Sequence, residues 1–376
     1  MDIAQDTHGN KHYILGKMGV DGQGTLYATK NKNIILREAA NAETNPDLIP
    51  LSEVDKLLLP IDYLAAPNVG YLINIPEDAV PLSHIMSNVE AMLPAKGIKR
   101  RLIILCEVAK ILIKLHSLPV MYGSMSPLRI FLTPKTDEAY LLYSDKINFS
   151  MSFTAESDAD PYISPEAKNG KGTTLASDSY TFGALAYDFL TLGQDEDALS
   201  DDLKEMLENT QLEKPLKRPK IAEIYKILLR QIDLIVTCKK CNSDFYYNKT
   251  ECLGCSSPPP RMFKAKIYDK VGESDIPRGL KILEFASHGQ FFWNYHTDNT
   301  LLTGGRLTPR IHCVLNISED RKLNLIFKNL MDKKITINDQ VVDVGKNALV
   351  SLPCELVRIT FSLYDKTYRY IDMVMI

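Results

Sequence analysis

The chain has 376 residues, which at about 150 residues per domain predicts two to three domains. Its 44 Lys and Arg residues nearly balance 47 Asp and Glu residues, so the formal net charge is −3. This balance argues against a nucleic-acid-binding protein, because such proteins are usually basic. With 45% hydrophobic and 24% charged residues, the composition is that of an ordinary globular protein and excludes fibrous or wholly disordered chains.

Neither end of the sequence nor its interior predicts a membrane protein. No run of about 18 apolar residues is present, as a transmembrane helix would require. Residues 1–6 are polar and acidic, whereas a secretory signal begins with a basic stretch and an apolar one. We therefore expect a cytoplasmic protein with no membrane partner. In this compartment the seven cysteines should be reduced or metal-bound.

The first block of the chain reads as strands followed by helices. Short strands are expected around a glycine-rich turn and again near residue 70, and apolar spacings of three and four then predict helices. The expected strands are 13–15, 25–28, 33–37 and 69–75, and the expected helices are 98–116, 177–192 and 219–236. This segregation predicts an α+β domain with two lobes.

A cysteine cluster follows the helices. Cys238 and Cys241 form one Cys-x-x-Cys pair, and Cys252 and Cys255 form another ten residues later. Four thiolates with this spacing predict a closed tetrahedral zinc site that is structural, not catalytic. A ribbon of this size has too small a core to fold alone, so the metal would supply the folding energy. An iron–sulfur centre and a redox pair are the less favoured alternatives.

The last block is rich in strands. The proline run 258–260 indicates a stiff linker, and we place a domain boundary there. Strands are expected at 311–317, 323–328, 334–338, 347–352 and 356–363, with a turn at Asn338 and Asp339. The spacing favours a small β-sandwich or barrel.

Several motifs of the first block occur in the order of one known family. They are LGKMGVDGQGTLY at 15–27, IILR at 34–37, GYLI at 70–73, KLHS at 114–117, YGSMSPLRIFL at 122–132, DPYISPE at 160–166, SDSYTFGALAY at 177–187 and KRP at 217–219. Over residues 10–235 the chain resembles a eukaryotic-like serine/threonine protein kinase domain. The resemblance implies a two-lobed protein-kinase-like fold for 1–236, followed by a four-cysteine zinc ribbon at 237–257 and a β-rich domain at 261–376.

The residues that perform chemistry in this family are altered. Phosphoryl transfer needs a phosphate-binding Lys, a catalytic Asp, a metal-binding Asn and a metal-binding Asp. By position these fall on Arg37, Ser124, Arg129 and Tyr143, with Asp145 two residues further along. The simplest interpretation is a pseudokinase with no catalytic residues. The alternative is a divergent active kinase in which Asp145 binds the metal.

Nucleotide binding is a separate question that the sequence leaves open. The residues that could hold a nucleotide are Gly19, Gly22, Gly24, Arg37 and Asp145. Glycines let backbone amides approach phosphates, but a clear magnesium ligand is missing. ATP with magnesium therefore stays uncertain, as does whether Arg37 contacts a phosphate or an internal carboxylate.

The resemblance also implies contacts that only hold the fold together. Glu166 should pair with Arg218, and Asp178 should hold the backbone of the loop 122–132. The glutamate of the family's helix C falls on either Glu43 or Glu53.

The C-terminal block resembles the second half of a forkhead-associated domain, through residues 336–342 and 356–361. Arg310 and His312 then stand in the Ser-Arg-x-His stretch, but Pro309 replaces its serine, so a phosphopeptide site would be incomplete. The alternative is a plain β-sandwich used for contact. The aromatic run 291–295 is expected to be core, or a partner patch if it is exposed.

Taken together, the three blocks are similar to bacterial kinases of tellurium-resistance and stress gene neighbourhoods. That resemblance implies a von Willebrand factor A-type protein and a metal-dependent 2C-type phosphatase as partners. The favoured function is a non-catalytic pseudokinase scaffold. The alternatives are an active serine/threonine kinase and a phosphopeptide-binding adaptor.

Overall fold

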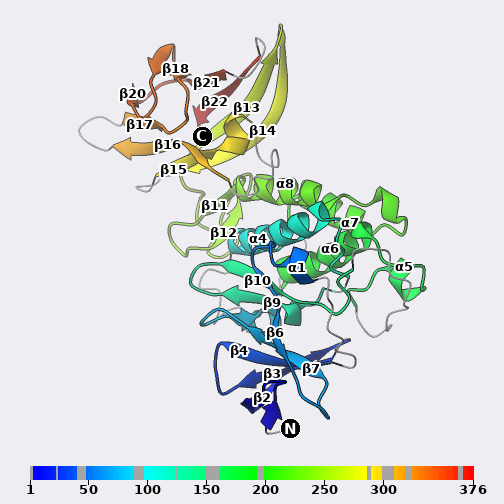
Figure 1. Ribbon diagram of the computed structural model, residues 1–376. Helices are drawn as coiled ribbons and strands as arrows, with labels where there is room; N and C mark the ends of the chain where they lie inside the picture. The colour runs from blue at the N-terminus through cyan, green and yellow to red at the C-terminus, as the bar shows by residue number, and fades with distance from the viewer. Residues whose placement is uncertain are drawn as a thin grey trace. The chain divides into compact units, whose positions relative to one another are not determined.

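The computed structural model describes most of the chain and divides it into two compact units, Met1–Leu229 and Arg230–Ile376. The described residues are 3–22, 24–39, 48–88, 97–123, 125–148, 161–192, 199–285, 289–298, 309–318, 324–362 and 367–376. Both units contain sheets, and the described helices lie mainly in the first, so the chain is a mixed α+β protein (Figure 1).

The first unit begins with a six-stranded antiparallel sheet in the order β1-β2-β3-β4-β7-β6. Its strands are β1 (Ile3–Gln5), β2 (Lys11–Asp21), β3 (Gly24–Thr29), β4 (Ile34–Ala39), β6 (Pro60–Tyr63) and β7 (Gly70–Asn74). Strands β2 and β3 form a long hairpin, whose tip joins Asp21 to Gly24. The central strands β4 and β7 are mostly buried, which explains their continuous apolar runs.

The rest of the first unit is mainly helical. Helix α4 (Ile98–Ser117) buries one apolar face, which includes Leu102, Leu105 and Leu112. The other elements are α1 (Leu48–Leu51), α2 (Leu82–Ser87), α5 (Pro165–Lys168), α6 (Leu175–Thr191), α7 (Asp201–Thr210), α8 (Ile221–Ile232), and the 3₁₀ turns η1 (Pro127–Arg129) and η3 (Pro215–Lys217). A small sheet of order β5-β10-β9-β8 accompanies them, formed by β5 (Leu57–Leu58), β8 (Val80–Pro81), β9 (Ile130–Thr133) and β10 (Glu138–Leu142).

The second unit contains the cysteine ribbon and a β-sandwich. The ribbon is a two-stranded sheet of β11 (Ile235–Thr237) and β12 (Asp244–Tyr246). One sandwich sheet has the order β14-β13-β22-β21-β18-β19 and the other β15-β16-β17-β20. The elements are β13 (Met262–Val271), β14 (Ser274–Glu284), β15 (Gln290–Trp293), α9 (Asn294–Thr297), β16 (Ile311–Ser318), β17 (Asn324–Asn329), β18 (Ile335–Ile337), β19 (Gln340–Val342), β20 (Asn347–Ser351), β21 (Val357–Ser362) and β22 (Tyr368–Met375).

The two sandwich sheets enclose one apolar core. Alternate residues point into it from both sheets, for example Phe263 and Ile267 on β13 and Leu325 and Phe327 on β17. This alternation is the signal on which the strand predictions were based, and every strand expected between 311 and 363 is present within about two residues. The turn at Asn338 and Asp339 is confirmed, with both residues at positive φ.

The proline run 258–260 does not coincide with the division between the units. That division falls near the end of α8, and the ribbon lies in the same unit as the sandwich. The reason is a shared core: Val236, Phe245 and Cys252 of the ribbon pack with Met262 and Ile282 of the sandwich.

Among the described helices, none has the length and apolar character needed to cross a membrane.

Candidate functional site

The centre of the first unit holds one carboxylate between two arginines. Asp21 lies at the tip of the β2–β3 hairpin, Arg37 on β4 and Arg129 at the end of η1. Arg129 Nε and Nη2 donate to Asp21 Oδ2 and Oδ1 at 2.9 and 3.1 Å. Arg37 Nη1 donates to Asp21 Oδ2 at 3.1 Å, and its Nη2 donates to Oδ1. Both guanidinium groups therefore bind the same carboxylate in a bidentate manner.

All three side chains of this cluster are shielded from water. The exposed fractions are 6% for Asp21, 3% for Arg37 and 2% for Arg129. Burial alone would raise the pKa of the Asp21 carboxyl, but the charges and hydrogen bonds of Arg129 and Arg37 outweigh it and lower that pKa to about 2. Asp21 is therefore ionised, and Arg37 binds an internal carboxylate.

Asp145 is the second carboxylate beside these arginines. Burial raises its pKa, while the charges of Arg129 and Arg37 and a hydrogen bond with Tyr71 act in the opposite direction. Tyr143 is instead packed in the core, with its ring 5.7 Å from that of Tyr71 in an edge-on arrangement. Asp145 and Tyr143 thus both interact with Tyr71, and Asp145 also interacts with the charges of the two arginines.

The glycines of the hairpin have different roles. Gly19 lies so close to η1 that an added Cβ would come within 2.8 Å of Leu128 Cδ1. Gly24 has a φ of 140°, which other residues rarely adopt. Gly22 is exposed, and a Cβ there would meet open space. Gly19 thus permits the hairpin to approach the segment that holds Arg129.

Alanine at Gly19 should loosen this approach, whereas alanine at Gly16 on the same strand should not. A Cβ added at Gly16 would have no other atom within 4 Å. We expect Gly19→Ala to cost about 1–3 kcal/mol through overpacking and Gly16→Ala to stay within about 0.5 kcal/mol. Denaturant unfolding of both variants, with hydrogen exchange over residues 11–29, measures the difference. Equal behaviour of the pair would show that the hairpin does not depend on this contact.

The loop that precedes η1 is held by Asp178 of α6. Its carboxylate accepts hydrogen bonds from the backbone amides of Tyr122 and Gly123, at 2.8 and 2.9 Å. His116 Nε2 lies 2.9 Å from the same carboxylate. The predicted structural role of Asp178 is confirmed.

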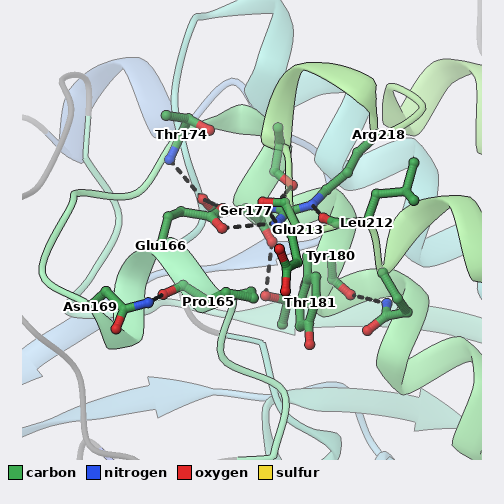
Figure 2. Close-up of polar contacts among 12 residues, drawn as sticks. Pro165, Glu166, Asn169, Thr174, Ser177, Tyr180, Thr181, Leu212, Glu213 and Arg218 are labelled. Atoms are coloured by element: carbon green, nitrogen blue, oxygen red, sulfur yellow. Dashed lines mark hydrogen bonds and ion pairs between the residues drawn. The ribbon is translucent and has the colours of Figure 1, made fainter.

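The second predicted structural contact is also confirmed. Glu166 on α5 and Arg218 after η3 form a bidentate ion pair, with nitrogen–oxygen distances of 2.6 and 2.9 Å (Figure 2). The Ser177 hydroxyl donates to Glu166, and Arg218 Nε donates to the carbonyl of Leu212. The Tyr180 ring lies 4.9 Å from the guanidinium carbon. The pair thus links α5, α6 and the segment before α8.

The four ribbon cysteines form a compact group in which all sulfur atoms lie within 4.8 Å of one another. Cys238 and Cys255 sulfurs are 3.6 Å apart, and Cys241 and Cys252 sulfurs are 3.5 Å apart. A tetrahedral zinc with Zn–S bonds of about 2.3 Å has sulfur–sulfur edges of about 3.8 Å. No disulfide joins these residues. The group is therefore compatible with a zinc site of four thiolate ligands.

The two Cys-x-x-Cys turns have matching backbones. Each ends in a residue at positive φ, Asn242 and Ser256, whose amide donates to the carbonyl of the turn's first cysteine. Within each turn a backbone amide also points at the first sulfur, from Lys240 and from Gly254 at 3.4 Å. Amides in this position can donate hydrogen bonds to sulfur atoms that a metal holds as thiolates.

Two of the residues singled out in the sandwich, Arg310 and His312, both contact α9. Arg310 is exposed, and its backbone pairs with Asn294. His312 Nδ1 lies 2.7 Å from the Thr297 hydroxyl. In the aromatic run, Phe292 is fully buried and its neighbours are half-buried, which fits the core interpretation.

Some predicted residues lie outside the described part of the chain, namely Ser124, Glu43 and Asp160. Glu53 is exposed and belongs to no described helix. Asp21 was missed at the sequence level, although a signal was present. That signal is the negative charge of Asp21 within the glycine-rich turn between Gly19 and Gly22. A carboxylate there repels phosphates and attracts cationic side chains such as arginine.

No protein-family model matches the chain, and no curated protein matches it either.

Proposed function

We propose that this protein is a non-catalytic pseudokinase that acts as a scaffold or regulator and binds protein partners in a bacterial phosphorylation-linked stress system. The observation that supports this proposal most directly is the buried Asp21 carboxylate, which engages both Arg37 and Arg129. In the family that the chain resembles, these two positions hold a nucleotide phosphate and a magnesium ion. In this chain both arginines instead bind the same carboxylate, that of Asp21.

The charges of the cluster argue against magnesium in this place. A divalent cation would stand beside two guanidinium groups that are 3% and 2% exposed, where repulsion is weakly screened. Tyr143, at the family's metal-binding Asp, has no carboxylate and packs on Tyr71. Phosphoryl transfer depends on such a metal to neutralise developing charge.

The contacts that maintain a kinase-like fold are retained beside this altered chemistry. Glu166 with Arg218, and Asp178 with the 122–123 backbone, match the resemblance residue by residue. The contacts that support the fold are present, whereas the positions that perform catalysis in the family carry other residues. This combination favours a binding protein over an enzyme. The partners implied by the resemblance are a von Willebrand factor A-type protein and a 2C-type phosphatase.

A phosphoryl-transfer assay tests the proposal. Zinc-loaded protein incubated with radiolabelled ATP and magnesium or manganese should incorporate no label into itself or into a general acceptor such as myelin basic protein, above a heat-denatured sample. Asp145→Ala should behave like the wild type. The alternative of a divergent kinase predicts metal-dependent labelling that Asp145→Ala abolishes, and that result would overturn the proposal.

The phosphopeptide-adaptor alternative has one favourable observation, the exposed side chain of Arg310 beside the half-buried His312. It predicts phosphothreonine-peptide binding that Arg310→Ala removes, measurable by fluorescence polarisation against the unphosphorylated peptide.

A further inference from the structure

Leu216 in η3 is the most exposed of the large hydrophobic residues that the structure describes, with its side chain completely accessible to solvent. A single exposed leucine is common on protein surfaces and needs no explanation by itself. Leu216 differs because its segment is firmly held. The amides of Lys217 and Arg218 close the 3₁₀ turn, and the Arg218 side chain donates to the carbonyl of Leu212 (Figure 2). A side chain presented on such a rigid turn loses little entropy when it binds.

A pocket lies on the same unit, close to Leu216 in sequence. Its volume is about 390 Å³, its surface is mainly apolar, and the described residues that line it are Tyr187 on α6 together with Leu199, Lys204, Leu207, Glu208 and Gln211 in and around α7. This volume is within the range of pockets that hold ligands or anchoring side chains. Gln211 precedes Leu216 by five residues, which span at most about 18 Å. One interface can therefore include both the pocket and the exposed leucine.

The two parts of this surface have opposite charges. The exposed acidic residues of α7 are Asp201, Asp202, Glu205 and Glu208. The exposed basic residues around Leu216 are Lys214, Lys217 and Lys220. Lys204 and Glu213 are the exceptions, and each part keeps a net charge of its own sign. A second copy that faces this surface can place its lysines against the acidic residues, and such complementarity favours association in one orientation.

We propose that two copies of this chain associate through α7 and η3, with Leu216 of each copy seated in the pocket of the other. A two-fold axis uses the same surface on both copies, so the contact of leucine with pocket and the contact of lysines with acidic residues each occur twice. The Asp21 cluster takes no part in this interface. The inference therefore goes beyond the proposed function and holds whether or not the chain transfers phosphoryl groups.

Sedimentation equilibrium of the full, zinc-loaded chain over the micromolar range tests the association. We expect the average mass to rise with concentration from the 42.4 kDa of one chain towards twice that value. The affinity should fall as the salt concentration rises, because exposed charges are screened by salt.

Replacement of Leu216 by serine tests the apolar contact. Each dimer loses two inserted side chains, so Leu216→Ser should raise the dissociation constant at least about ten-fold. The Tm of the variant should equal that of the wild type, because Leu216 is completely exposed within one copy. Leu15→Ser is the matched control, since Leu15 is also exposed in the first unit but lies on β2. Its dissociation constant should not change.

Paired charge reversal tests whether the partner is a second copy. One variant combines Lys214→Glu with Lys217→Glu, and the other combines Glu205→Lys with Glu208→Lys. Each variant alone should associate at least about ten-fold more weakly than the wild type, because like charges then face each other. An equimolar mixture of the two should form heterodimers with nearly the affinity of the wild type, because opposite charges face each other again.

A mass that stays at that of one chain over the whole concentration range overturns the inference, and the pocket then belongs to a different occupant. A dimer whose affinity is the same in Leu216→Ser as in the wild type also overturns it, because association then uses another surface. So does a mixture of the two charge-reversed variants that remains monomeric.

Discussion

Replacement of Cys252 by serine is expected to abolish zinc binding and to lower the stability of the whole second unit, not of the ribbon alone. Cys252 is almost completely buried and belongs to a core that joins the ribbon to Met262 on β13 and Ile282 on β14. Structural zinc contributes about 10–16 kcal/mol of apparent free energy in small zinc domains. When the ribbon unfolds, Met262 and Ile282 lose the apolar residues that bury them, and they become exposed to water.

Hydrogen bonds extend this coupling beyond the apolar core. The Ile282 amide donates to the carbonyl of Asp233, and the Thr237 amide donates to Glu284. Lys281 and His296 both contact the buried Asp233 carboxylate, at 2.5 and 2.7 Å. Disorder that starts at the ribbon therefore reaches β14 and α9.

We expect Cys252→Ser to destabilise the second unit by at least about 3 kcal/mol, or roughly 10 °C in Tm. Since the chain has two compact units, scanning calorimetry should be analysed as two transitions, with hydrogen exchange over residues 230–285 to assign them. Metal content should fall from one zinc per chain to none.

Cys354→Ser is the matched control, because Cys354 lies in the same unit and outside the cluster. Its zinc content should match the wild type, and its Tm should change by only a few degrees. Cobalt substitution adds a spectroscopic check, since a tetrahedral site of four thiolates gives intense visible absorption. If both serine variants melt together at the wild-type temperature, the ribbon does not stabilise the sandwich.

The strands and helices were predictable because their signals are local. Alternation along residues 311–362 and the three-and-four spacing within α4 arise from which side chains face the core. The four-cysteine group was predictable for the same reason, since two Cys-x-x-Cys turns each bring two thiols together. Local spacing suffices whenever neighbours in sequence are neighbours in space.

The central cluster and the unit boundary depend on distant partners. Arg129 is 108 residues from Asp21, and no pattern around either residue reveals the other. The proline run 258–260 resembles a linker, yet Met262, two residues beyond it, belongs to the same apolar cluster as Phe245 of the ribbon. Composition indicates where a chain stiffens but not which apolar surfaces meet across that point.

Glu166→Gln is expected to destabilise the first unit by about 3–5 kcal/mol, roughly 10 °C in Tm. The change keeps the shape of the side chain but leaves Arg218, whose side chain is 0% exposed, without a counter-ion. Asp78→Asn is the matched control, because the Lys135–Asp78 pair is exposed and surface ion pairs contribute little to stability.

The pH dependence of the same variant provides a second, independent test. Burial raises the pKa of Glu166, but hydrogen bonds from Arg218 and Ser177 outweigh it and lower that pKa below its ordinary value of 4.5. A carboxyl with a lowered folded-state pKa stabilises the fold above its unfolded-state pKa and loses this contribution as the pH falls. The difference in unfolding free energy between wild type and Glu166→Gln should therefore be constant from pH 6 to 8 and shrink below about pH 4.5. A difference that stays constant down to pH 3 would show that the pair contributes through packing, with no part from the charge of Glu166.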